Sequence, residues 1–373
     1  MLTTLAAPAF AEIWHIENGD ITISAGESGN NVTQNNNTTY GDTNTIITNQ
    51  NKDTASSHTV TIETNDKNDK VEVTLKDVNI DTSSRNKAAV SVTGEGDTNI
   101  KLDGDNALKS DIYRSGIYGS GSGSLTISGG ENDSLTAQGG SGANGISSSG
   151  SLTISGGTVT ANGDDGGRGI SSSGSVTISG GSTVTANGGS GTISGGDGIC
   201  SSGGVTISGG STVTANGGNG GSLVGGDGIR SGGGLTVSDG TVTAKGGNGD
   251  SKDGYGGDGI RSGGVVTISG NTVNAAGGYG GKVGGYGICS FDRVAISGGT
   301  VEAAGGNGST GGGSGIYSSV IDLSGSLELT AKAGSPTGKA LLQNGRELDL
   351  DTIKDKLDPG ANIITKDADG KVI

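Results

Sequence analysis

Three aspartates recur at the same place in a repeated motif, and their spacing is suited to a metal site. Asp197, Asp227 and Asp258 each stand in the run GGDGI, 30 and 31 residues apart, and Asp250 and Asp253 lie in the loop before the third run. Carboxylates that lie side by side in adjacent repeats repel one another. Ca²⁺ prefers oxygen ligands, and carbonyl groups of the glycine-rich loops would complete its shell. We therefore expect either a calcium site at Asp197, Asp227 and Asp258 or three solvated carboxylates.

Two arginines follow the same motif in successive repeats. Arg230 and Arg261 each come directly after the isoleucine of a GGDGI run, so we expect them to stack near Asp227 and Asp258. Guanidinium groups bind carboxylates with strong, charge-assisted hydrogen bonds. These arginines would either balance the charge of the aspartates or contribute to a site for carbohydrate.

Three tyrosines lie in or beside the long glycine-rich segments, namely Tyr255, Tyr279 and Tyr286. Tyrosine combines an apolar ring, which can stack on a sugar ring, with a polar hydroxyl. Neighbouring Asp and Asn side chains can bond sugar hydroxyls. The alternative is that these rings anchor their loops. Together with Arg230 and Arg261, the three tyrosines are the candidate carbohydrate-binding residues.

Groups suited to catalysis are few. His15 and His58 are the only histidines, and neither has a partner at metal-ligand spacing. Neither a GxSxG elbow nor an HExxH motif occurs. A polysaccharide lyase would need carboxylates, Ca²⁺ and a basic residue on one sheet, and only the two arginines named above, with Asp227 and Asp258, offer such a set. We predict a protein that is not an enzyme and keep lyase activity as an alternative.

A repeat must position these residues, and its unit is clearest in Gly145–Gly163, GISSSGSLTISGGTVTANG. Apolar residues alternate with Ser and Thr in this unit, as in strands with one buried face. An apolar residue opens each unit, at spacings of 24–31 residues: Val60, Val90, Ile117, Ile146, Ile170, Ile199, Ile229, Ile260, Ile288 and Ile316. We predict an all-β fold, a single-stranded right-handed parallel β-helix (solenoid) of about ten coils with a C-terminal cap.

The chain divides into three segments. Residues 1–11 resemble the end of a secretion signal, with an Ala-Phe-Ala cleavage pattern before Glu12. Residues 12–340 form the predicted β-helix, in which the polar run 30–44 is expected to be a surface loop. Residues 341–373 are expected to be a cap over the open end of the stack or the start of a further module.

Composition limits the partners. The formal net charge of −15 disfavours nucleic acid and anionic lipid, which need a basic face, and no apolar run is long enough for membrane insertion. The 80 glycines are expected at sharp corners where the backbone adopts a positive φ. Cys200 and Cys289 occupy equivalent places three coils apart, about 14 Å. This separation is too large for a disulfide.

The phrases VTLKDVNI and IKLDGDNALKS, followed by units such as SGSLTISGGTVTANG, resemble a known family. It comprises the secreted carbohydrate-binding parallel β-helix proteins of Gram-positive anaerobes, related to the pectate-lyase-like superfamily. The resemblance covers Asp20 to about Ala340. It implies a right-handed parallel β-helix, an extracellular location, binding of acidic polysaccharide or plant fibre and, in some members, bound calcium.

These observations predict a secreted or cell-surface β-helix that binds polysaccharide or serves as a surface adhesin, without catalysis and with Ca²⁺ as the one cofactor considered. A purely structural cell-surface spacer is the first alternative, because copied repeats alone would create rows of identical side chains. Polysaccharide lyase activity is the second. The expected partner is a plant or cell-wall glycan, including acidic ones.

Overall fold

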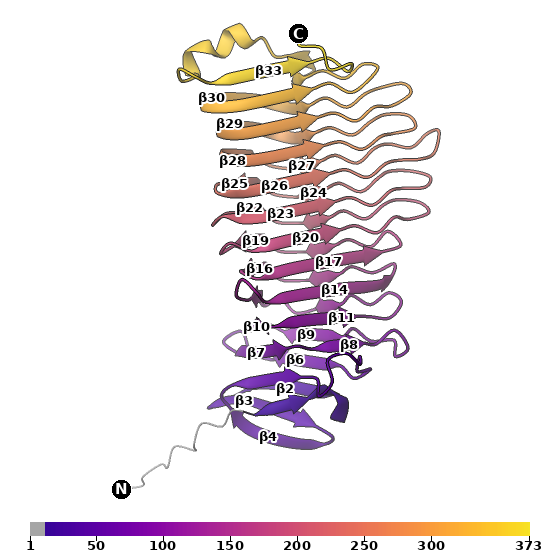
Figure 1. The fold of residues 1–373 in the computed structure, drawn as a ribbon, viewed down its shortest axis with the longest axis vertical. Helices are drawn as coiled ribbons and strands as arrows, with labels where there is room; N and C mark the ends of the chain where they lie inside the picture. The colour runs from indigo at the N-terminus through magenta and orange to yellow at the C-terminus, as the bar shows by residue number, and fades with distance from the viewer. Residues whose placement is uncertain (1–11) are drawn as a thin grey trace.

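The computed structural model describes residues 12–373, which form one parallel β-solenoid of about 11 turns (Figure 1). The predicted secretion-signal remnant, residues 1–11, lies outside the described residues. Successive turns stack from the indigo end to the yellow end, and their long loops stack as a ridge along one side. The predicted all-β, parallel β-helix fold is therefore confirmed, with about one turn more than the sequence indicated.

Three stacks of strands build the solenoid. The first stack contains β2 (Ile21–Gly26), β6 (Val60–Thr64), β9 (Val90–Gly94), β12 (Ile117–Gly119), β15 (Ile146–Ser148), β18 (Ile170–Ser172), β21 (Ile199–Ser201), β24 (Ile229–Ser231), β27 (Ile260–Ser262) and β31 (Leu341–Gln343). The second contains β5 (Thr45–Thr48), β7 (Lys70–Lys76), β10 (Asp97–Asp103), β13 (Leu125–Ser128), β16 (Leu152–Ser155), β19 (Val176–Ser179), β22 (Val205–Ile207) and β25 (Leu235–Val237).

The third stack contains β8 (Asn79–Asp81), β11 (Asp105–Lys109), β14 (Ser134–Ser141), β17 (Thr158–Asp164), β20 (Thr183–Asn187), β23 (Ser211–Asn216), β26 (Gly240–Lys245) and β33 (Asn362–Lys366). In three late turns a single strand runs through the corners: β28 (Val266–Ala276), β29 (Ile288–Ala304) and β30 (Ile316–Lys332). β28 pairs with both β25 and β26, so it belongs to the second and third stacks. β29 and β30 pair along all three stacks.

Columns of aliphatic side chains fill the interior. Ile170, Ile199 and Ile229 are fully buried and pair directly with one another in the first stack. Val213 and Ala215 of the third stack are also fully buried, and each pairs with a residue of its own type in the turns on either side. Full burial of a Val, Leu or Ile side chain contributes about 1.5–3 kcal/mol. A thin core of small side chains is sufficient because each turn is covered by the turns on either side.

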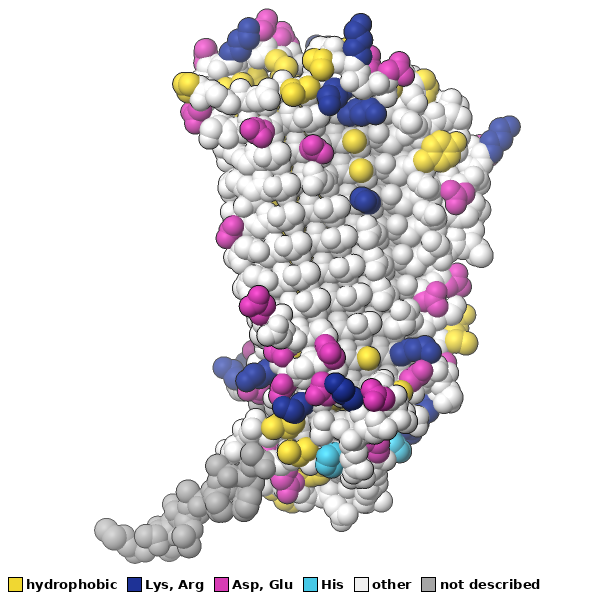
Figure 2. Space-filling view, in the orientation of Figure 1, with side chains coloured by type: hydrophobic (Ala, Val, Ile, Leu, Met, Phe, Trp, Pro, Cys, Tyr) yellow, Lys and Arg dark blue, Asp and Glu magenta, His cyan; other side chains and the backbone are white. Residues whose placement is uncertain are grey.

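The outer surface of the middle turns carries few charges. On the face in Figure 2, charged side chains gather near the two ends of the rod, and the surface between them is mostly white. The repeats there consist largely of Gly, Ser, Thr and small aliphatic residues. A charged group in these turns is therefore an exception to the pattern of the repeat.

The polar run 30–44 does not form a surface loop, so that prediction is wrong. It contains β3 (Gly29–Gln34) and β4 (Asn37–Asp42), which continue β2 as an antiparallel meander. Asn30 is 7% exposed, and its Nδ2 donates to Thr45 Oγ1 at 2.9 Å and to the Glu72 carbonyl at 2.8 Å. An amide side chain can thus satisfy polar groups at the end of the stack, where an aliphatic one cannot.

The first third of the chain also extends the aliphatic column by one turn. Ile21 on β2 pairs with Val60 on β6 and is fully buried. The short strand β1 (Ile13–His15) pairs in parallel with β5, and the 3₁₀ helix η1 (Ile16–Asn18) links β1 to β2.

The C-terminal segment lies over the last full turn (Figure 1). β33 pairs with β30, the 3₁₀ helix η2 (Leu350–Lys356) precedes it, and β32 (Arg346–Glu347) forms a hairpin with β31. Ile353 of η2 is 5% exposed and belongs to the core. Within residues 12–373, no helix has the length and apolar character that a membrane span requires.

The glycine-rich loops contact each other backbone to backbone. The Gly226 N–H donates to the Gly218 carbonyl, and the Gly247 N–H donates to the Gly226 carbonyl, both at 2.8 Å. Each loop leaves the third stack through one glycine segment and returns to the first stack through another, and these two kinds of segment alternate along the rod. The same backbone hydrogen bonds continue from Gly247 through Gly257, Gly278, Gly285, Gly306, Gly313 and Gly334. We call this row of glycines the glycine zipper. A Cβ at Gly226 would lie 1.9 Å from the carbonyl oxygen of Gly196, so no other residue fits there.

This contact corrects the reason expected for the high glycine content. Positive φ does occur at the corners between the second and third stacks, for example at Gly180 (φ 68°) and Gly181 (φ 70°). Gly218 and Gly226 have no positive φ. In the loops glycine is required because two backbones approach too closely for a side chain, which is a separate reason from conformational freedom.

We expect Gly226→Ala to destabilise the solenoid by at least about 3 kcal/mol, because its Cβ would overlap a backbone carbonyl that cannot rotate away. Gly298→Ala is the matched control, since its Cβ would meet nothing closer than 3.6 Å and Gly298 has no positive φ. Thermal unfolding followed by circular dichroism measures both. Equal melting temperatures for the two variants would contradict the steric role of the zipper.

Candidate functional site

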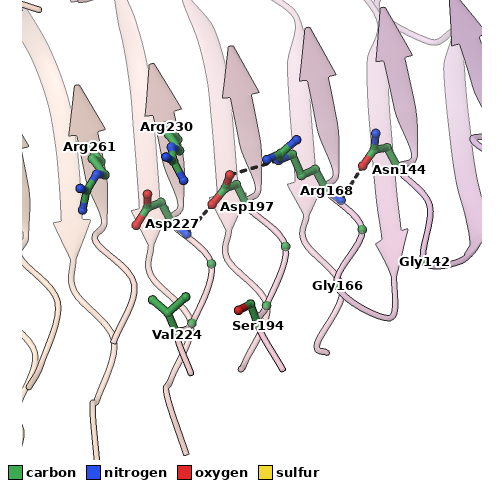
Figure 3. A pocket seen from close by; sticks show the side chains of 15 residues that line it. Gly142, Asn144, Gly166, Arg168, Ser194, Asp197, Val224, Asp227, Arg230 and Arg261 are labelled. Atoms are coloured by element: carbon green, nitrogen blue, oxygen red, sulfur yellow. Dashed lines mark hydrogen bonds and ion pairs between the residues drawn. The ribbon is translucent and has the colours of Figure 1, made fainter. Parts of the chain in front are cut away.

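A cleft of about 610 Å³ opens between the loop ridge and the first strand stack (Figure 3). Arg230 and Arg261 lie on β24 and β27, and the backbone of the glycine-rich loops forms the opposite wall. Arg168, Asp197 and Asp227 lie where successive loops return to their strands. We call this cavity the main cleft. It brings four residues singled out in the sequence together with Arg168.

The three aspartates form a buried column. Asp197, Asp227 and Asp258 are 6%, 7% and 4% exposed, so the expectation of solvated carboxylates is wrong. Asp197 Oδ1 accepts the backbone N–H of Asp227 at 2.9 Å, and Asp227 Oδ1 accepts that of Asp258 at 2.8 Å. Asp258 Oδ1 accepts the N–H of Tyr286 at 2.7 Å. Each carboxylate therefore satisfies a backbone donor of the next turn.

The arginines pair with two of the three carboxylates. Arg168 Nε lies 3.2 Å from Asp197 Oδ2, and Arg261 Nη1 lies 3.3 Å from Asp258 Oδ2. Arg230 makes no hydrogen bond or ion pair with the described residues, although it follows Asp227 at the same offset as Arg261 follows Asp258. The second oxygen of Asp227 likewise has no hydrogen-bond partner among residues 12–373. The middle of the cleft thus contains one guanidinium and one carboxyl oxygen that make no hydrogen bond or ion pair with residues 12–373, although Arg230 acts electrostatically on Asp258 and Arg261 on Asp227.

The environment of the column changes its titration. Burial raises the pKa of Asp227 to about 8, and the neighbouring Asp258 and Asp197 carboxylates act in the same direction. Burial also raises the pKa of Asp258, but the Tyr286 N–H and Arg261 oppose this change. Asp227 differs from Asp258 because it lies between two like charges and because no arginine among residues 12–373 is within ion-pair distance of it; Arg261 opposes the rise in its pKa only from further away.

The calcium site expected at Asp197, Asp227 and Asp258 stays a prediction. No group of three or more His, Cys, Asp or Glu side chains within residues 12–373 is arranged to hold a metal ion. One oxygen of each carboxylate accepts a backbone N–H, and two of the three second oxygens face arginines. A cation would have to compete with these guanidinium groups.

The three candidate tyrosines do not lie together. Tyr286 stacks on Tyr317, with ring centroids 5.0 Å apart and an angle of 16° between the rings. Its backbone continues the aspartate column, so this pair lies directly beyond the main cleft. Tyr255 and Tyr279 are 46% and 48% exposed on the loop ridge, and Lys282 Nζ lies 5.7 Å from the Tyr255 ring centroid.

Sequence reasoning missed two residues of the site. Arg168 stands two residues before the buried isoleucine of its turn, the same offset as Asp197 in the next turn. Asn144 has this offset one turn earlier, and its Oδ1 accepts the Arg168 N–H at 2.8 Å. If the turns are aligned on their buried isoleucine, the residue two positions before it identifies both Arg168 and Asn144. The GGDGI motif selects only the turns in which this residue is an aspartate.

Neither cysteine forms a disulfide, as their separation predicted. Cys289 occupies an outward position between Arg261 and Tyr317 in the first stack, yet it is only 1% exposed. Burial raises the pKa of the Cys289 thiol to about 12 and that of Cys200 to about 11. Both thiols are therefore protonated and poorly nucleophilic near neutral pH.

Comparison of the chain with models of known protein families, with curated proteins and with solved structures finds no match.

We expect Asp227→Asn to raise the melting temperature at pH 8 and to leave it nearly unchanged at pH 4. The pKa of this carboxyl is about 4 in the unfolded chain and about 8 in the folded protein. The folded protein therefore loses stability as the pH rises from about 4 to about 8. Asparagine keeps the acceptor for the Asp258 N–H, as Asn144 does for Arg168 in the same column.

Asp227→Ala is the control, because it removes the charge and the acceptor together. It should cost about 1–3 kcal/mol at both pH values, since the buried Asp258 N–H loses its partner. Melting curves of the three proteins between pH 4 and pH 9 measure these effects. A parallel pH dependence of Asp227→Asn and wild type would show that Asp227 does not titrate in this range.

Proposed function

We propose that this protein is an extracellular, non-catalytic β-solenoid that binds polysaccharide in the main cleft. The observation that carries this proposal is a pair of groups there, the Arg230 guanidinium and the second oxygen of Asp227, which have no hydrogen-bond or ion-pair partner within residues 12–373. Both line an open cavity of about 610 Å³. Sugar hydroxyls can accept a hydrogen bond from the Asp227 carboxyl, whose raised pKa keeps it largely protonated near neutral pH, and sugar hydroxyl or carboxylate oxygens can accept from the Arg230 guanidinium.

The surroundings of these two groups suit a sugar chain. Salt bridges hold Arg168 and Arg261 on either side of Arg230, so these two arginines have defined positions. Successive turns are about 4.8 Å apart, which places repeated polar groups along the direction in which a linear chain would lie. The opposite wall is glycine backbone, so sugar rings can approach closely and bond peptide groups.

An aromatic platform lies beyond one end of the main cleft. The stacked pair of Tyr286 and Tyr317 continues the aspartate column, and Arg261 lies 5.1 Å from the ring centroid of Phe291. Tyrosine rings bury apolar area while the hydroxyl stays wet, which suits the faces of sugars. The extracellular location in this proposal rests on the secretion-signal pattern in residues 1–11 and on the family resemblance.

Arg230→Ala should weaken binding of an acidic polysaccharide by roughly tenfold or more, because a charge-assisted contact is lost while no internal ion pair is broken. Affinity electrophoresis or calorimetry with polygalacturonate, hyaluronan and neutral dextran measures the affinities. Arg293→Ala, an exposed arginine that does not line the main cleft, is the control.

Three outcomes separate the proposal from its alternatives. Binding that depends on Arg230 and not on Arg293 supports it. Binding to none of the glycans would favour a structural spacer. Release of an unsaturated product that absorbs in the ultraviolet would identify a lyase, for which Asp227, Asp258, Arg230 and Arg261 would be the acting groups.

Removal of calcium with a chelator should leave the affinity for polysaccharide unchanged. The reason is that the Oδ2 atoms of Asp197 and Asp258 already form ion pairs with Arg168 and Arg261. The measurement is calorimetry with and without EDTA, followed by added Ca²⁺. A tenfold fall on chelation that Ca²⁺ restores would instead place a calcium ion at the aspartate column.

A further inference from the structure

Two more cavities continue the line of the main cleft towards the N-terminal end of the solenoid. A cavity of about 220 Å³ shares Gly142 and Asn144 with the main cleft. A third cavity, of about 360 Å³, shares Arg114 and Tyr118 with the second. The three cavities therefore meet end to end. We call the second and third cavities together the N-terminal groove.

Strand register confirms that these cavities follow one face. Tyr118 occupies the outward position of β12, and seven successive parallel pairings connect β6 to β27 through this stack. These pairings place Tyr118 in the same outward column as Arg230 and Arg261. At about 4.8 Å for each step, the line of cavities is roughly 34 Å long.

Within the described part of the chain, the N-terminal groove is lined by two cations and by no acidic side chain. Its charged residues are Arg114 and Lys87, and the rest of its lining is Ser, Thr, Asn, Ala, Gly and Tyr. Such a lining is unusual in a chain with a net charge of −15. Arg114 Nε donates to Asn86 Oδ1 at 3.2 Å, and Lys87 Nζ lies 3.1 Å from Asp20 Oδ2, so both cations are held beside the groove.

Exposed aromatic rings accompany these cations. Tyr118 is 43% exposed and lines both cavities of the groove. Tyr113 is 77% exposed and lies against Gly142, at the junction with the main cleft. A ring beside a guanidinium provides a flat apolar surface next to a positive charge, which suits a sugar ring that carries an acidic group.

We propose that the N-terminal groove is a second binding subsite, which holds the continuation of a carboxylate-bearing polysaccharide chain bound in the main cleft. Tyr118 stacks on a sugar ring, and Arg114 and Lys87 bind the carboxylates. This inference rests on the proposed function and adds that the ligand is linear, acidic and long enough to span both sites. Its consequence is that affinity rises with chain length until the whole line of cavities is occupied.

Calorimetry with two oligogalacturonides tests this proposal. A trimer is short enough to lie in the main cleft alone, and a decamer is long enough to reach the N-terminal groove as well. In the wild type the decamer should bind more tightly than the trimer. Tyr118→Ala and Arg114→Ala should weaken the decamer by roughly tenfold and leave the trimer unchanged. Arg230→Ala should weaken both.

Tyr40→Ala is the control, because Tyr40 is 73% exposed on β4 and lines none of the three cavities. Unchanged melting temperatures would show that the variants are folded. If the decamer binds and neither Tyr118→Ala nor Arg114→Ala alters its affinity, the second subsite is overturned and the proposed function stands. The same holds if these variants weaken trimer and decamer equally. If neither oligomer binds the wild type, the proposed function is overturned together with the subsite.

Discussion

Each turn of this solenoid must reproduce the backbone path of the turn beside it, because its strands and loops hydrogen-bond to that turn along nearly their whole length. This constraint decides which residues are allowed at each point. Inside, it stacks Ile170, Ile199 and Ile229 directly on one another. In the loops it brings backbone against backbone, so that only glycine fits at positions such as Gly226. The high glycine content is therefore a property of tight packing and not of disorder.

The same constraint turns a single polar residue into a column. A carboxylate at the loop return accepts the N–H of the next turn, so repetition places Asp197, Asp227 and Asp258 in contact with one another's backbones. Like charges this close and this buried raise each other's pKa unless cations offset them. Arg168 and Arg261 form ion pairs with the outer two carboxylates, and Arg261 opposes the rise in the pKa of Asp258. The backbone contacts of the column thus place polar side chains along the wall of the main cleft.

The fold could be predicted almost completely from the sequence, whereas the site could be predicted only in part. The spacing of buried aliphatics directly reports the turns, because a period that repeats through the whole chain is typical of stacked units. The spacing of Asp227 and Arg230 likewise predicted that they lie in one region, and they do. It could not show that the carboxylates are buried, since burial depends on how far the glycine loops fold over the column. Arg168 was missed because its column repeats in geometry but not in residue type.

The middle of the column shows how identical sequence can give different chemistry. DGIR occurs in two successive turns, yet Asp258 pairs with Arg261 while Asp227 and Arg230 stay apart. The two turns differ in their neighbours. Asp227 lies between Asp197 and Asp258, and each of these two carboxylates forms an ion pair with an arginine. A buried carboxyl without an ion-pair partner costs stability when it ionises, and its pKa rises so that it stays protonated over a wider pH range. A repeat built for stability alone would replace Asp227 with asparagine, which the same column tolerates at Asn144. The position of Arg230 and Asp227 at the centre of an open cleft is the basis of our proposal that the cleft binds polysaccharide.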